Sequence, residues 1–126
     1  MTHKTYTAYT TSPPIVNFTY RGLHCSISLN SLGAWCGYVN YPDSRIPKSI
    51  IKNMKVHGGV TYCSGGRAGF DCCHGDDYVP GIHGTTTMQE LSKYRSRDYA
   101  RAHVKILADQ IADLLADQDA YLSSQL

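Results

Sequence analysis

The sequence contains no apolar run that approaches membrane-spanning length, and its first residues, Met1–Tyr6, lack the apolar core of a signal peptide. Charge of one sign is also scarce. Twelve Lys and Arg residues against ten Asp and Glu residues give a formal net charge of +2. This balance provides no strong bulk attraction to nucleic acid. We therefore predict a soluble, cytosolic protein that binds neither membrane nor DNA.

Metal-site and disulfide patterns are missing as well. The five cysteines are an odd number and include no C-x-x-C pair; they are Cys25, Cys36, Cys63, Cys72 and Cys73. A zinc site would need Cys72 or Cys73, His74 and a distant cysteine, yet adjacent cysteines on a strand point apart. A chain of 126 residues is long enough to bury a core without such staples. We predict reduced, mostly buried thiols, with no metal and no cofactor.

Strand patterns occupy the chain from residue 15 to residue 83. Residues 15–20 are β-branched and aromatic, and residues 23–29 alternate apolar with polar side chains, so a hairpin around Arg21-Gly22 is predicted. A further strand is expected at 35–39. Residues 56–63 and 68–74 are interpreted as two strands joined by a glycine turn. A short helix within 46–54, starting at Pro47, and a loose segment at 1–14 complete this part.

After Gly84 the pattern becomes helical. Residues 87–90 have the spacing of a capping box, and Ser96 begins a second, longer helix in the same way. The apolar side chains then repeat at intervals of three and four, at Val104, Leu107, Ala108, Ile111, Leu114 and Leu115. The prediction is one α+β domain over 1–126. It has an antiparallel sheet body at 15–83 and a helical part at 87–118, whose amphipathic helix packs on the sheet.

Several groups of residues could carry chemistry. The paired glycines after His57 let the backbone approach a ligand, or mark a β-bulge beside a structural histidine. Cys72 and His74 lie on one face of a strand and could form a nucleophilic pair. Arg97 and Arg101 are four residues apart at a helix start, which favours phosphate, although a solvated face is the ordinary alternative.

Aromatic side chains are biased toward tyrosine, with ten tyrosines against two phenylalanines. A flat ring beside arginines is what a nucleotide needs, because the base stacks while the phosphates contact the cations. Ordinary core packing explains the same residues, among them Trp35, Tyr62 and Phe70. From the residues alone, the sequence indicates a small α+β domain with a possible phosphate or nucleotide site.

Four segments in order resemble a known family. They are Cys36-Gly37-Tyr38-Val39, Val56-His57-Gly58-Gly59-Val60-Thr61-Tyr62, Gly69-Phe70-Asp71-Cys72-Cys73-His74-Gly75-Asp76, and the helix start Arg97-Asp98-Tyr99-Ala100-Arg101. Together they are similar to small phage and prophage proteins of the first Thoeris anti-defence family, over roughly residues 15 to 118. Before Cys36 the chain departs from the family pattern, because Ala34-Trp35 replaces a more polar, basic pair.

The resemblance implies a sponge that binds cyclic ADP-ribose-type signals, and in some members cyclic oligonucleotides, without cleaving them. It also implies a homo-oligomer built on dimers, in the cytoplasm of a bacterial host. Phe70 would stack on adenine, and Arg97 or Arg101 would clamp the diphosphate. Arg21 could add a cation from a neighbouring subunit. His57 and Asp71 would be lesser ribose or phosphate contacts.

Two other classes of function remain open from the sequence. A small nucleotide or phosphate hydrolase would use His57, Asp71, His74 and Asp76, with or without a metal. A protein-interaction module would use the tyrosine-rich surface and bind no small molecule.

Overall fold

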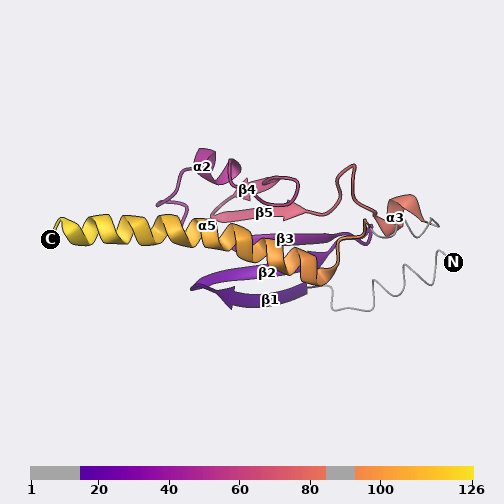
Figure 1. Cartoon of the computed structure of the whole chain (residues 1–126), viewed down its shortest axis with the longest axis horizontal. Helices are drawn as coiled ribbons and strands as arrows, with labels where there is room; N and C mark the ends of the chain where they lie inside the picture. The colour runs from indigo at the N-terminus through magenta and orange to yellow at the C-terminus, as the bar shows by residue number, and fades with distance from the viewer. Residues whose placement is uncertain (1–14, 85–92) are drawn as a thin grey trace.

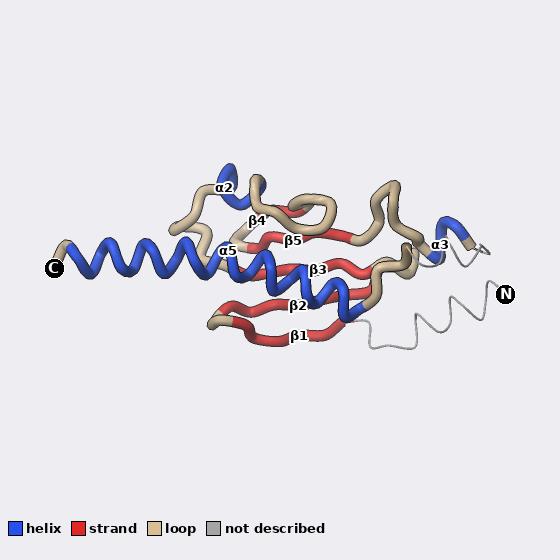
Figure 2. The backbone as a smooth tube through the Cα atoms, viewed as in Figure 1, coloured by secondary structure: helices blue, strands red, loops and turns tan. Residues whose placement is uncertain are grey.

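The computed structural model describes residues 15–84 and 93–126. The strands of this part are β1 (Ile15–Tyr20), β2 (Leu23–Leu29), β3 (Trp35–Asn40), β4 (Tyr62–Ser64) and β5 (Arg67–Asp71). They form one antiparallel sheet in the order β1-β2-β3-β5-β4 (Figure 1; Figure 2). With the long helix described next, this confirms the predicted α+β class.

The helix α5 (Arg97–Ser124) covers one face of the sheet. Ser96 caps it as predicted, because its Oγ accepts a hydrogen bond of 3.1 Å from the Tyr99 amide. Figure 1 shows α5 lying across β2 and β3 and then running on beyond the sheet. Its 28 residues span about 42 Å, roughly twice the length of a six-residue strand.

The core lies between α5 and the sheet. Its helix side is the buried stripe Ala100, Val104, Leu107, Ala108, Ile111 and Ala112. On the sheet side, alternate residues such as Ile27, Val39 and Phe70 are almost completely buried. The apolar residues that alternate along the strands therefore pack against the apolar stripe that repeats every 3.6 residues on the helix, as the sequence predicted.

The β1–β2 hairpin turns within two residues. Arg21 has φ 51° and Gly22 has φ 79°, so both turn residues adopt the left-handed conformation of the tight turn that matches strand twist. Tyr20 pairs with Leu23 across it.

Two predicted strand boundaries are wrong. Residues 56–61 are not a strand, because Gly58 and Gly59 adopt φ of 67° and 81°, which a pleated strand does not accommodate. β5 ends at Asp71 rather than at residue 74. The short helix is α2 (Lys48–Lys52), and α3 (Pro80–His83) was not predicted. The predicted capping box at 87–90 and the segment 1–14 lie outside the described residues.

All five cysteines are free thiols, as predicted. Burial raises the pKa of Cys25 and Cys36 to about 11 and that of Cys72 to about 12. In residues 15–84 and 93–126, no helix is both long and apolar enough to cross a bilayer.

Candidate functional site

Two of the predicted arginines lie together at the start of α5. Arg97 and Arg101, the arginine pair, are one turn apart on the side of α5 that faces β1. The guanidinium carbon of Arg101 lies over the Phe18 ring, 4.2 Å from its centroid, which is a cation–π contact. The nearest carboxylate of Arg97 is its neighbour Asp98, at 3.9 Å. This contact is long and Asp98 is exposed, and no other ion pair within the described part involves Arg97 or Arg101, so both guanidinium groups can still contact an anion.

Arg21 is not near the arginine pair. Its Nη1 lies 2.8 Å from Asp113 Oδ1 and 3.1 Å from Asp109 Oδ1, on the middle turns of α5. These hydrogen bonds raise the pKa of Arg21. Asp109 lies 8 residues after Arg101 and 12 after Arg97, so about 12 to 18 Å of helix separates it from the arginine pair. Within one chain, Arg21 pairs with α5 and does not add a cation to the arginine pair.

Phe70 is buried rather than open to a ligand. Its exposed fraction is 1%, and its ring packs under α5 beside Gly37 and Val104. The structure therefore does not support the expectation that Phe70 stacks on adenine, because almost none of its side chain is open to solvent. Truncating it would remove a core side chain at a cost of about 3–5 kcal/mol.

His57 lies at the centre of a polar network that ties two loops to α5. Its Nε2 donates to Asp77 Oδ2 at 2.9 Å, and its Nδ1 contacts the Tyr99 hydroxyl at 2.8 Å. The His57 amide donates to His103 Nδ1 at 3.0 Å. The rings of His74 and His103 lie 5.8 and 5.7 Å from that of His57. We call His57, His74 and His103 the histidine cluster.

Asp77 is the anionic anchor of this network. Its side chain has no exposed surface, and Arg95 Nε donates to its Oδ1 at 2.9 Å. Oδ2 also accepts from the His74 amide at 3.0 Å. Burial alone would raise the pKa of Asp77, but these hydrogen bonds and the one from His57 outweigh burial and lower it. Asp77 is thus ionised and fully partnered at neutral pH.

The predicted contact residue Asp71 connects to the histidine cluster through His74. His74 Nε2 lies 3.4 Å from Asp71 Oδ1 but makes no hydrogen bond. Asp71 itself accepts from Thr61 Oγ1 at 3.1 Å and from the Cys73 amide at 3.0 Å. The structure therefore joins His57 and Asp71 at one edge of the sheet, while the arginine pair faces β1.

His57 and Cys72 are not placed to act as a general base and a nucleophile. Both ring nitrogens of His57 are occupied, by Asp77 and Tyr99, so neither is free to accept a proton from water. The thiol of Cys72 is buried and its raised pKa keeps it protonated, which makes it a poor nucleophile. Within the described residues, no three His, Cys, Asp or Glu side chains gather as a metal site.

His103 gives the network a testable pH dependence. Burial, with smaller contributions from His57 and Arg95, lowers the pKa of His103, and its Nδ1 must stay unprotonated to accept from His57. The unfolded chain gains a proton at His103 near the ordinary value of about 6.5, before the folded chain does. Stability should therefore fall as pH drops from 7 to 5. His103→Gln should make this fall, measured by thermal unfolding, smaller; an unchanged slope would contradict the assignment.

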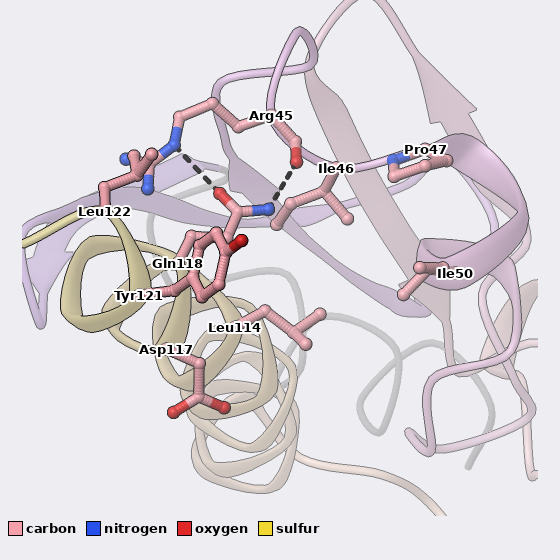
Figure 3. A pocket seen from close by; sticks show the side chains of 9 residues that line it. All are labelled: Arg45, Ile46, Pro47, Ile50, Leu114, Asp117, Gln118, Tyr121 and Leu122. Carbon is pink, nitrogen blue, oxygen red and sulfur yellow. Dashed lines mark hydrogen bonds between the residues drawn. The ribbon is translucent and has the colours of Figure 1, made fainter. Parts of the chain in front are cut away.

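An apolar groove of about 510 Å³ lies elsewhere, between α5 and the residues that lead into α2. Ile46, Pro47, Ile50 and Leu114 line it, with Tyr121 and Leu122 (Figure 3). Its cation is already paired, because Arg45 contacts Asp119 at 2.7 Å and Gln118 at 3.0 Å. This groove is therefore not suited to phosphate.

Sequence reasoning missed most of the network. Asp77, Arg95, Tyr99 and His103 were not assigned to a site from the sequence. The spacing of Tyr99 and His103, four residues apart on α5, was a usable signal, since such residues share one helix face. No sequence signal places Asp77 beside His57.

Comparisons with models of known protein families, with curated protein sequences and with solved structures found no match.

Proposed function

We propose that the protein binds a cyclic ADP-ribose-type nucleotide signal and sequesters it without cleavage. The observation that carries the proposal is the arginine pair. Arg97 and Arg101 project from the first turns of a 28-residue helix, and the carboxylate paired with them among the described residues is the exposed Asp98, 3.9 Å from Arg97. Guanidinium groups in this position favour a diphosphate, because their forked donors and the positive end of the helix act on the same anion.

Two further features support binding over catalysis. His57 has both ring nitrogens engaged by Tyr99 and Asp77, and a sponge requires no general base. The resemblance of the four sequence segments to the first Thoeris anti-defence family supports the same function. On this proposal the protein acts in a bacterial host cytoplasm, as a homo-oligomer built on dimers, and silences a TIR-dependent defence.

The structure changes the residues assigned to the site. The adenine is not stacked on Phe70, since that ring lies in the core. The half-buried Phe18, which Arg101 covers on one side, is an aromatic side chain in direct contact with the arginine pair. We assign the diphosphate to the arginine pair and place His57 in support of α5 rather than in contact with ligand.

The test is to identify what the protein retains. Purified protein is incubated with extract from TIR-activated cells, freed of unbound nucleotides and heat-denatured, and mass spectrometry identifies what is released. An intact cyclic ADP-ribose isomer is expected. Arg97→Ala and Arg101→Ala should each weaken its binding by more than tenfold, since charged hydrogen bonds contribute about 1.5–3 kcal/mol each.

Lys52→Ala is the matched control. Lys52 is an exposed cation on α2, so this variant removes one positive charge without touching the arginine pair. It should retain the nucleotide. A linear product that accumulates with turnover would make the protein an enzyme, and the absence of any nucleotide would favour the protein-interaction module.

A further inference from the structure

A row of three residues crosses the sheet on the face opposite α5. Gly69 on β5 pairs with Tyr38 on β3 and with Tyr62 on β4. Gly37 and Phe70, one position away, face α5, because a Cβ on Gly37 would lie 2.4 Å from Val104. Successive strand residues point to opposite faces, so Tyr38, Gly69 and Tyr62 point away from α5.

These residues surround a hollow. The rings of Tyr38 and Tyr62 are 5.9 Å apart and nearly perpendicular, at 86°. A cavity of about 450 Å³ lies beside them, and we call it the tyrosine hollow; it is lined by Asn30, Cys36, Tyr38, Thr61, Tyr62, Phe70, Asp71 and Cys73. Gly69 is required in the row, because a Cβ there would lie 2.4 Å from the Tyr38 ring.

The two ends of the hollow differ in charge. Asp71 lies two residues along β5 from Gly69, about 7 Å away, and its side chain is 31% exposed. Each of its oxygens accepts one hydrogen bond from the protein and keeps a second lone pair. Oδ1 also lies 3.4 Å from His74 Nε2, which makes no hydrogen bond. In the other direction, Arg67 does not itself line the hollow, but its guanidinium carbon lies 4.0 Å from the ring centroid of Tyr38, which does. No ion pair in the described ranges involves Arg67, so its donors are available.

This arrangement matches one class of ligand. A flat base can stack on the half-exposed Tyr62 ring, which is 46% exposed. The Asp71 carboxylate, an acceptor only, suits a base edge with two adjacent N–H donors, and Arg67 suits a phosphate. Guanine presents N1–H beside its amino group, whereas adenine presents the N1 lone pair, which a carboxylate repels.

We propose that the tyrosine hollow binds a guanine nucleotide, with the base edge on Asp71, the base face on Tyr62 and the phosphate at Arg67. This site goes beyond the proposed sequestration of a cyclic ADP-ribose-type signal, and it lies on the opposite face of the sheet from the arginine pair.

The test is to titrate the full chain separately with guanosine 5′-monophosphate and with adenosine 5′-monophosphate and to measure binding by calorimetry. The chain is used unchanged and with Arg97→Ala and Arg101→Ala combined, which removes both guanidinium groups of the arginine pair. Guanosine 5′-monophosphate should bind at least tenfold more tightly than the adenine nucleotide. Tyr62→Ala should weaken it about tenfold, whereas Tyr62→Phe should retain it. Asp71→Asn should remove the preference for guanine.

Thr19→Ala is the control, because Thr19 is exposed on the same face but on β1; it should bind as the unchanged chain does. Thermal unfolding of each variant confirms that it is folded. Equal affinity for the two nucleotides, no binding of either, or full binding by Tyr62→Ala would overturn the proposal. Each of these results would leave the test of the arginine pair unaffected, because that test uses different residues and a different ligand.

Discussion

Asp77→Ala is expected to lower the free energy of unfolding by about 3–5 kcal/mol, the usual effect of breaking a buried ion pair by removing one partner. The Asp77 side chain has no exposed surface and binds Arg95, His57 and the His74 amide. Without it, Arg95 and His57 lose the acceptor that holds two loops against α5. Urea unfolding at pH 7 measures the change.

Asp76→Ala is the matched control, because Asp76 is the adjacent carboxylate and is exposed; a change within about 0.5 kcal/mol is expected. Acid unfolding gives a second measure. The lowered pKa of Asp77 means that its stabilisation is present above the unfolded value of about 3.9 and is lost as pH falls through the folded value. Asp77→Ala should lack this part of the acid transition. A loss below 1 kcal/mol at pH 7 would show that the network does not hold the loops.

Gly37→Ala is expected to destabilise the protein by about 3 kcal/mol, at the upper end of the range for overpacking a core. A Cβ at Gly37 would lie 2.4 Å from Val104 Cγ2 and 2.5 Å from Phe70 Cε1. Both neighbours are almost completely buried, so neither can move without opening the seam between β3 and α5. Thermal and urea unfolding both report this change.

Gly75→Ala separates this clash from the general effect of replacing glycine. A Cβ at Gly75 would meet no atom within 4 Å, and a small change of either sign is expected. Equal stability of the Gly37 and Gly75 variants would show that α5 does not pack as closely on β3 as the structure describes.

The fold could be predicted from the sequence where the local pattern of apolar residues itself determines the secondary structure and the buried face. The alternation in residues 23–29 and the three-and-four spacing from Val104 onward both follow from which side chains face the core. The failures have a physical origin too. Residues 56–61 look like a strand in composition, but Gly58 and Gly59 turn the backbone so that His57 reaches α5.

The candidate site was predictable only in part. Arg97 and Arg101 were predicted to share a helix face, because their spacing alone decides it. The partners of His57 come from residue 77 and from α5, and only the three-dimensional arrangement brings them together. Phe70 was assigned to a ligand because the sequence motif does not show whether its side chain faces solvent or the core. Strand pairing with Gly37 decides that it is buried.

The position of α5 at the end of the described chain has a consequence for synthesis in the cell. Every strand of the sheet precedes α5 in the sequence, so the ribosome produces the whole apolar face before it produces the cover. At about 5–20 residues per second, the 28 residues of α5 take roughly one to six seconds to translate. During that interval the nascent sheet exposes Ile27, Val39 and Phe70 to chaperones or to other nascent chains. A truncated mRNA that ends before the Val104 codon would yield a polypeptide in which the apolar face of the sheet is never covered.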